Sequence, residues 1–257
     1  MDYGKSYEKN IMNSLYLIHT PTLGHESLVD TIESVQRQTY KNVKHVITTD
    51  TEEGHEKVSK ILNSIKPKNT LHFKNPETVG NPNGVRLTVG VSYLVNYDYW
   101  QNCGTGDWIE DTHFQNVNDT FEKYKCSWVW CLRKIWDWNK ELIAPDIFES
   151  IGHHISWNNY RFIIANDCHI VPRHFMHCIA NLNVIAPMYK TCNDQVIFNE
   201  LRYKFPHFRC TNNYSFNFRL NQDRDLQKNE SAKKWYLEGY RVMNELYPDG
   251  KYPWILK

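Results

Sequence analysis

Three aspartates stand where a carboxylate could take part in chemistry. Asp107 lies in the run of residues 103–108, whose two glycines leave room for backbone amides to approach phosphate oxygens. Asp167 follows an apolar run, and Asp194 precedes the apolar residues of a predicted helix. A carboxylate at such a place can hold Mg²⁺ or Mn²⁺, or it can accept a proton from a hydroxyl. Asp167 can equally be a turn residue, and Asp194 can be a helix N-cap.

The elements that must position these side chains alternate between strands and helices. Short apolar or β-branched runs predict four strands, at residues 14–20, 43–50, 70–73 and 97–103. Apolar residues three and four apart predict three helices between them, at residues 28–38, 58–65 and 85–95. This order is typical of an α/β fold with a mostly parallel sheet flanked by helices. Ligands bind beyond the carboxyl ends of such strands, so residues 20–22, Asp50 and residues 104–107 are expected to line one crevice.

The second half of the chain has a mixed pattern. It predicts a helix at residues 112–124, strands at 126–135 and 160–172 with a turn at 137–141, and an amphipathic helix at 230–247. The expected buried side of the last helix is Trp235, Val242, Met243 and Leu246. No repeat or linker divides the sequence, so these elements are expected to belong to one domain.

Tryptophan is concentrated in the middle of the chain, where seven of the nine lie between residues 100 and 157. Large rings fill cores, and Trp128 and Trp130 alternate with Val129 as a half-buried strand would. Rings also form stacking platforms for sugars and nucleobases. Four tryptophans flank polar motifs and are the candidates for that role: Trp108, Trp136, Trp138 and Trp157.

Composition and charge narrow the class of protein. The chain has 30 Lys and Arg against 29 Asp and Glu, and this net charge of +1 gives no basic field for non-specific nucleic-acid binding. Residues 200–257 hold 11 Lys and Arg against 7 Asp and Glu, an excess that suits a solvated helix face or a secondary phosphate contact. No apolar stretch reaches the roughly 18 residues of a membrane helix, and no signal peptide is visible. We therefore expect a soluble, cytoplasmic protein.

The cysteines and histidines do not form a recognisable motif. Seven cysteines without a C-x-x-C pair predict reduced thiols rather than a disulfide framework. Zinc-type ligands occur at residues 153–154, 168–169 and 174–178, but their spacing matches no zinc motif. The short glycine runs lack the Gly-Lys-Ser/Thr of a P-loop. Zinc, thiol and P-loop chemistry are therefore the weaker interpretations.

Four segments of the sequence together resemble a known family. The run HTPTLGHESLVDTIESVQRQTYKNVKHVITTD, residues 19–50, resembles the opening of family 2 glycosyltransferases of the GT-A fold. GNPNGVRLTVGVSYL resembles the segment that closes over the donor, and DWIEDTH the stretch after the metal motif. CNDQVIFNELRYKFP resembles the acidic motif before an acceptor-side helix. The similarity covers about residues 14–220 and keeps the order and spacing of the family.

The resemblance implies a reaction and a set of site residues. Such enzymes pass a sugar, hexosyl or pentosyl, from a nucleotide-diphosphate sugar to an acceptor hydroxyl, usually with inversion. The expected donor-binding residues are Thr20, Pro21, Thr22 and Asp50 for the nucleoside, Arg86 for the diphosphate, and Gly104, Thr105 and Trp108 beside them. Asp194 is the expected general base, and Asp167 is the second candidate for that role.

The chain departs from the family at the metal motif. The family has two or three aspartates where residues 103–108 hold one, so Asp107 is the expected Mg²⁺ or Mn²⁺ ligand, with Asp111 or His113 as helpers. Alternatively, backbone amides at Gly104 and Gly106 replace the metal. The lost carboxylates also fit a degenerate GT-A domain that binds a nucleotide or sugar without transfer.

Taken together, the sequence predicts a single GT-A, Rossmann-like domain over residues 1–257. About 14–110 would be the nucleotide-sugar-binding half, about 111–225 the acceptor and catalytic half, and 226–257 a peripheral helix and tail. The acceptor is expected to be either a saccharide or a hydroxymethylated base in DNA, because the domain is small and its C-terminal end is mildly basic.

Overall fold

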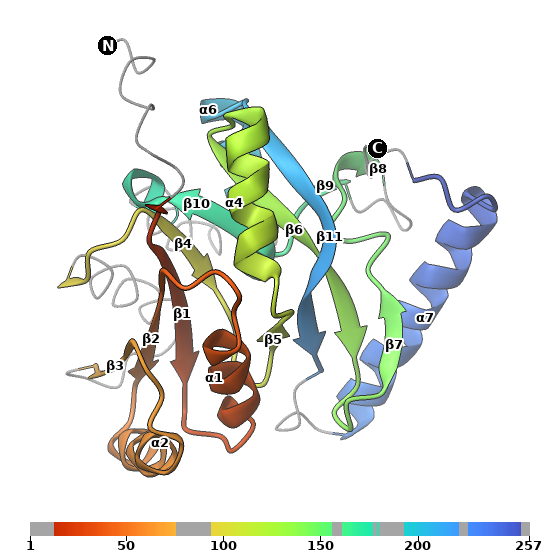
Figure 1. Ribbon diagram of the computed structural model, residues 1–257. Coiled ribbons are helices and arrows are strands. Elements are labelled where there is room, and N and C mark those ends of the chain that lie inside the picture. Colours follow the sequence, from red (N-terminus) through yellow and green to blue (C-terminus); the bar gives the residue numbers. More distant parts are fainter. Residues whose placement is uncertain are drawn as a thin grey trace.

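The computed structural model describes residues 13–75, 94–155, 161–176, 179, 193–220 and 226–252. Within these ranges nine strands form one sheet in the order β3-β2-β1-β4-β10-β6-β11-β5, with β7 paired to β6 (Figure 1). A separate antiparallel pair joins β8 (Gly152–Ile155) to β9 (Arg161–Ile163). The chain therefore has the predicted α/β architecture with a mixed sheet.

The first half of the sheet follows the sequence pattern closely. Its parallel strands are β1 (Tyr16–Thr22), β2 (Val43–Thr49), β3 (Thr70–Lys74) and β4 (Tyr99–Asn102). Helices α1 (Leu28–Gln36) and α2 (Glu52–Ile65) connect them, and Leu28, Ile32 and Val58 of these helices pack around Ile47 of β2. These four strands and two helices confirm the predictions, while the helix predicted at 85–95 lies almost wholly outside the described residues.

The second half of the sheet has a less regular topology. Its elements are β5 (Trp108–Ile109), α4 (His113–Tyr124), β6 (Trp128–Trp136), β7 (Leu142–Pro145), β10 (His169–Pro172), α6 (Asn193–Lys204), β11 (Phe208–Arg219) and α7 (Leu226–Leu246). Strand β10 runs antiparallel to both β4 and β6, and so joins the two halves of the sheet. Strand β11 is parallel to β6, with two register shifts.

The single strand predicted at residues 160–172 is wrong. The structure has β9 and β10 there, which belong to different sheets, and the 3-10 turn η3 (Asn166–Cys168) separates them. Asn102 donates a side-chain hydrogen bond to the carboxylate of Asp167, which fixes this turn against β4. A polar pair inside an apolar run thus ends one strand and begins another.

The buried side predicted for the C-terminal helix is partly wrong. Met243 is buried, but Leu246 is 62% exposed, and Tyr236 is buried in its place. Helix α7 begins at Leu226 and packs beside β7 at one edge of the molecule (Figure 1). Tyr236 and Met243 join a small apolar cluster there, separate from the main core.

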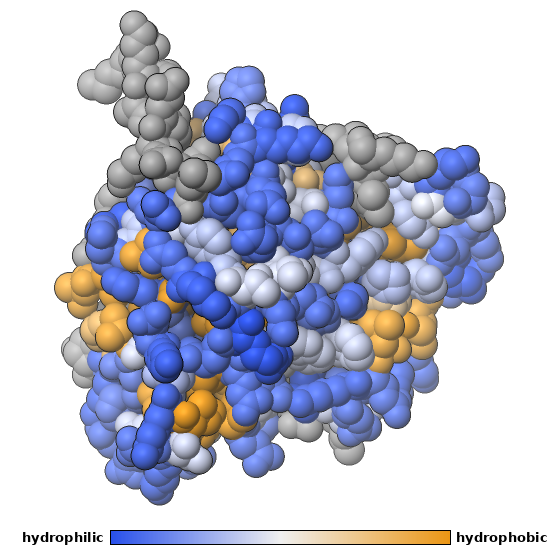
Figure 2. All heavy atoms as spheres, in the orientation of Figure 1, coloured by the Kyte–Doolittle hydropathy of each residue, from blue (hydrophilic) through white to orange (hydrophobic). Residues whose placement is uncertain are grey.

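Trp128 and Trp130 of β6 belong to the core. Trp128, Val129 and Trp130 are all buried, so the half-buried alternation predicted for this strand is wrong. Helix α4 covers one face of β6 and β11, while Trp128 packs against Phe198 of α6. A strand covered on both faces no longer shows an exposed side. The face shown in Figure 2 is mostly hydrophilic, with apolar side chains in small separate groups.

No helix among the residues described has the length and apolar character needed to cross a membrane.

Candidate functional site

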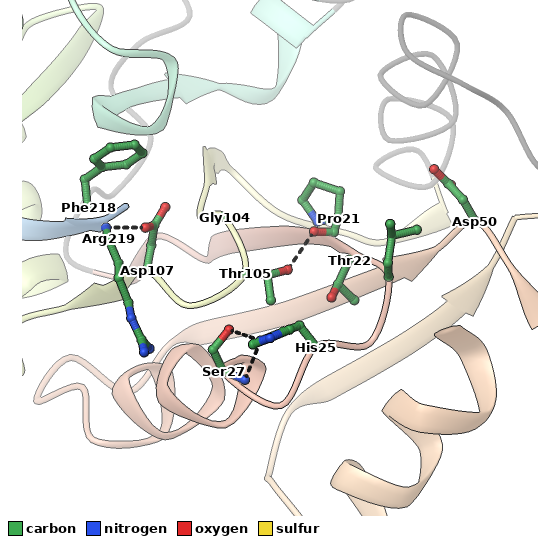
Figure 3. A pocket seen from close by; sticks show the side chains of 11 residues that line it. Pro21, Thr22, His25, Ser27, Asp50, Gly104, Thr105, Asp107, Phe218 and Arg219 are labelled. Carbon is green, nitrogen blue, oxygen red and sulfur yellow. Dashed lines mark hydrogen bonds between the residues drawn. The ribbon is translucent and has the colours of Figure 1, made fainter. Parts of the chain in front are cut away.

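A cavity of about 440 Å³ opens at the carboxyl ends of β1, β2 and β4. Its lining comes from segments far apart in the sequence (Figure 3): Pro21, Thr22, Leu23, His25, Ser27, Asp50, Gly104, Thr105, Asp107, Phe218 and Arg219. The structure thus brings together six predicted site residues: Pro21, Thr22, Asp50, Gly104, Thr105 and Asp107. This is the place where open α/β sheets bind their ligands.

The loop after β1 is held against the start of α2 by two glycines. Gly24 has a φ of +84°, and a Cβ on it would lie 2.8 Å from the Gly54 carbonyl oxygen. The Thr22 hydroxyl accepts a hydrogen bond of 3.0 Å from the Gly24 N–H, which closes the turn. This close approach brings the loop next to Asp50, whose carboxylate accepts a hydrogen bond from the side chain of buried Asn75.

The turn from Gly104 to Asp107 forms the opposite wall. The Thr105 hydroxyl donates to the Pro21 carbonyl oxygen at 3.1 Å, which ties this turn to β1. Gly106 has a φ of +86° and donates its N–H to the Thr31 hydroxyl at 3.0 Å. The Gly104 N–H faces the Asp107 carboxylate and favours its charged form. The Gly106 amide therefore serves the turn itself, and the alternative in which the Gly104 and Gly106 amides hold phosphate in place of a metal stays a prediction.

Asp107 is buried although it lines the cavity. One carboxylate oxygen, Oδ1, accepts a hydrogen bond of 2.8 Å from the Arg219 N–H. A Cβ at Gly104 would lie 2.7 Å from Oδ2, so only glycine leaves room for this carboxylate. Burial, with a smaller contribution from the charge of Asp167, raises the pKa of Asp107 well above its ordinary value.

Arg219 is the cavity residue that sequence reasoning missed. Its guanidinium donates two hydrogen bonds, of 3.2 and 2.7 Å, to the Trp138 carbonyl oxygen and pairs with Asp30 at 3.1 Å. Lys140 pairs with the other oxygen of Asp30 at 2.6 Å. Arg219 lies more than a hundred residues from Asp107, and its strand, β11, lies in a segment for which the pattern predicted no strand. No local signal marks it.

Five predicted residues lie away from the cavity lining or outside the described ranges. Thr20 is buried between β1 and β2, where its hydroxyl bonds to His45 Nε2 at 2.9 Å. Trp108 packs on Trp136 with ring centroids 5.2 Å apart, and neither ring lines the cavity. Arg86 and Trp157 lie outside the described residues. Phe218 is the aromatic side chain that lines this cavity in the part of the chain described.

Of the three residues expected at a metal, Asp107, Asp111 and His113, Asp107 alone lines the cavity. Asp111 pairs with Arg37 on the surface, and His113 is buried in hydrogen bonds to Ser215 and Gln101, so neither helper reaches Asp107. Within the described ranges no three His, Cys, Asp or Glu side chains group closely enough to hold a metal ion. Asp107 is the one expected ligand at the cavity, and its role in holding a metal stays a prediction. The five described cysteines, Cys103, Cys126, Cys131, Cys168 and Cys210, are free thiols.

Asp167 and Asp194 belong to a second cluster of charges behind the cavity wall. Asp194 lies in the first turn of α6, which packs against η3, and the Asn166 N–H faces its carboxylate. Burial raises the pKa of Asp194 to about 7, helped by the charge of Asp167 and opposed by Arg133. Burial also raises the pKa of Asp167. A carboxyl group with a pKa near neutrality can take up and release a proton under physiological conditions.

Arg133 joins this charge cluster to the cavity. It lies on β6 with its guanidinium buried, and it pairs with Asp146 at 2.7 Å and with Glu149. Tyr236 of α7 donates a hydrogen bond of 3.2 Å to the same Glu149 carboxylate. The guanidinium also stacks over the Phe218 ring, 4.9 Å from its centroid, and Phe218 lines the cavity. One buried cation therefore contacts the carboxylates and the cavity wall, and Glu149 links it to the peripheral helix.

Comparison with known proteins identifies the fold. No family model matches the sequence, and no curated protein matches it significantly. Solved structures do match: S. aureus TarS 1-349 with a TM-score of 0.60 and 11% identity, covering 90% of this chain and 71% of that one. The same protein in complex with UDP-GlcNAc gives 0.58, 11%, 83% and 60%, and a longer TarS chain gives 0.56, 10%, 80% and 37%. The chain thus has the GT-A fold and spans between 37% and 71% of these structures.

Proposed function

We propose that the protein transfers a sugar from a nucleotide-diphosphate sugar to an acceptor hydroxyl with inversion. One observation carries this proposal: in a GT-A fold, the predicted donor-binding residues from three strand ends meet around a single cavity. The S. aureus TarS structure of the same fold was solved in complex with UDP-GlcNAc, which supports a donor of this class. The fold alone supports no particular sugar.

The donor lies, in this proposal, with its nucleoside between Pro21 and Asp50. Asn75 holds the Asp50 carboxylate by a hydrogen bond and leaves its other oxygen as an acceptor for the base or the ribose. The diphosphate faces the turn at Gly104 and the guanidinium of Arg219, the arginine that lines the cavity in the described part of the chain. Charge-assisted hydrogen bonds to phosphate favour such a pairing.

The transfer step needs a base for the acceptor hydroxyl. Asp194 accepts that proton while the acceptor oxygen forms a bond to the anomeric carbon. The bond from this carbon to the phosphate oxygen breaks at the same time, and the nucleoside diphosphate leaves with its electron pair. The pKa of about 7 suits this exchange, because a base works best when its pKa lies near the working pH.

The acceptor is proposed to be a saccharide hydroxyl or the hydroxymethyl group of a modified base in DNA. Both offer a primary or secondary alcohol to the same base. A DNA acceptor requires phosphate contacts, and binding through such contacts weakens steeply with salt. Electrophoretic binding to hydroxymethylated and unmodified duplex at two salt concentrations separates the two. Absence of salt-sensitive binding leaves the saccharide.

The central experiment measures release of nucleoside diphosphate from a panel of nucleotide sugars, UDP-GlcNAc included, with Mn²⁺ and with EDTA. We expect slow release by the wild type and a loss of about 100-fold or more in Asp194→Asn, the usual scale for removing a general base. Asp111→Asn is the matched control, because this aspartate pairs with Arg37 on the surface. Its activity should equal that of the wild type.

Each outcome decides one part of the proposal. Full turnover by Asp194→Asn removes that residue as the base and leaves Asp167 as the candidate. Release only with Mn²⁺, lost in Asp107→Asn, assigns a metal to Asp107. Nucleotide binding without release from any donor would overturn catalysis and establish the degenerate, binding-only domain.

A further inference from the structure

A chain of hydrogen bonds runs through the core from β11 to η3. His113 of α4 contacts Ser215 Oγ through Nδ1 at 2.8 Å and Gln101 Oε1 through Nε2 at 2.7 Å. Gln101 Nε2 then donates to the Asp167 carbonyl oxygen at 2.8 Å. The three side chains are buried, at 0–2% exposure. A buried polar chain this complete orders what lies at its end.

The Asp167 carbonyl oxygen, the last acceptor of these hydrogen bonds, fixes which atom donates in each of them. The Asp167 carbonyl oxygen can only accept, so Gln101 must present its NH₂ group to η3 and its oxygen to His113. His113 must then carry its proton on Nε2, which leaves Nδ1 to accept from the Ser215 hydroxyl. Burial lowers the pKa of His113 to about 3, so the ring stays neutral and keeps this tautomer.

The turn that receives the chain carries two groups that face Asp194. Helix α6, which carries Asp194, packs against this turn. Asp167 brings a like charge close to Asp194, and the Asn166 N–H faces its carboxylate. The other charged groups facing Asp194 are Arg133 of β6 and Glu149, which follows β7. A shift of η3 would therefore change the surroundings of the proposed base, whereas η3 supplies no residue to the lining of the donor cavity.

We propose that His113, together with Ser215 and Gln101, is a positioning residue that holds η3 so that Asp167 and the Asn166 amide face Asp194. The inference rests on the proposed function for its catalytic meaning. Its structural part, the coupling of the buried chain to Asp194, holds without any reaction. No substrate contact is assigned to these three side chains.

The first test uses no activity. Imidazole ¹⁵N NMR should show His113 protonated on Nε2 only, and carboxyl ¹³C NMR, assigned with Asp194→Asn, gives the titration midpoint of Asp194. In Ser215→Ala and in Gln101→Met that midpoint should fall, because the repulsion from Asp167 that is lost exceeds the lost interaction with the Asn166 amide. Ser215→Thr keeps the hydroxyl and should restore the wild-type midpoint. Asn118→Ala is the matched control, because Asn118 lies on the same helix α4 and accepts a buried hydrogen bond from the Tyr16 hydroxyl of β1. This variant should leave the midpoint of Asp194 unchanged.

The second test uses turnover. In Ser215→Ala the kcat should fall by up to about 100-fold, the scale of a small misplacement of a reacting group, with little change in the KM for donor. The pH profile of kcat should shift with the NMR midpoint. An unchanged midpoint in both Ser215→Ala and Gln101→Met, or an equal shift in Asn118→Ala, would overturn the inference. If the wild type releases no nucleoside diphosphate, only the proposed function is overturned. The NMR result still decides whether the buried hydrogen bonds are coupled to Asp194.

Discussion

The two halves of the sheet differ in the titratable side chains that they bury, because a group of buried carboxyls occurs only in the second half of the part described. Between β1 and β2 lie two histidines, His19 and His45, each bonded at 2.9 Å to a threonine hydroxyl on the neighbouring strand. Burial lowers their pKa values to about 4 and about 3, so both are neutral. Around β6 and η3 lie the carboxyl groups of Asp107, Asp167 and Asp194, whose pKa values burial raises.

This difference indicates that the two histidines have a structural role, whereas the carboxyl groups are the candidates for chemistry. Each histidine makes one hydrogen bond to the neighbouring strand through Nε2, its Nδ1 is buried without a partner, and the ring carries no charge. The carboxyl groups come from three different elements, Asp167 repels each of the other two, and the buried guanidinium of Arg133 opposes this repulsion. Such an arrangement is costly for folding, and perturbed carboxyl groups of this kind are typical of functional sites.

The largest expected effect comes from removing that guanidinium. Arg133→Met leaves Asp146 and Glu149 buried without their partner, and breaking a buried pair in this way costs about 3–5 kcal/mol of unfolding free energy. Urea denaturation measures it. Arg241→Met is the control, because that arginine pairs with Glu238 and Glu245 on the surface of α7 and should change stability little. Equal midpoints for both variants would show that the stability of the second half of the sheet does not depend on this cation.

The buried histidines predict a stability that falls in acid. Below pH 6.5 the unfolded chain protonates His45, but the folded chain does not until about pH 3. The stability is therefore complete above pH 6.5 and is lost as the pH falls towards 3, by about 2 kcal/mol for one such group at pH 5. In His45→Asn the loss between pH 8 and pH 5 should be smaller by that amount, as measured by urea denaturation at each pH.

A variant in the other half should show the opposite sign. The folded chain holds the proton of Asp194 up to about pH 7, whereas the unfolded chain releases it near pH 3.8, so this group lowers stability as the pH rises. In Asp194→Asn this loss of stability between pH 5 and pH 8 should therefore be smaller than in the wild type. If His45→Asn and Asp194→Asn shift the pH dependence in the same direction, the contrast between the halves is wrong.

The sequence predicted the first half of the fold well because its signals are local. The strands and helices from Tyr16 to Lys74 follow one another along the chain, and each is recognisable from apolar spacing alone. The strand ends then meet by topology, which is why Pro21, Asp50 and Asp107 could be expected in one crevice.

The second half was harder to predict because its determinants are distant contacts. Strand β11 pairs with β6 across some eighty residues and with β5 across about a hundred, and these pairings bring Arg219 to the cavity and its N–H to Asp107. The engagement of the Gly106 amide likewise depends on a distant side chain, that of Thr31. The residue types at this turn do not reveal that contact.

The smallest expected effect tests the local character of the first half. The Thr51 hydroxyl accepts a hydrogen bond of 3.0 Å from the Gly54 N–H and so caps α2, next to the loop that lines the cavity. Thr51→Ala should cost about 1 kcal/mol of unfolding free energy, the usual effect of losing an N-cap. Thr51→Ser keeps the hydroxyl and should retain most of the stability. Because the cap supports only its own helix, the midpoint of the Asp194 carboxyl by ¹³C NMR should stay at its wild-type value in both variants. A change in that midpoint would mean that the first half is coupled to the charges of the second, and that its stability is not local.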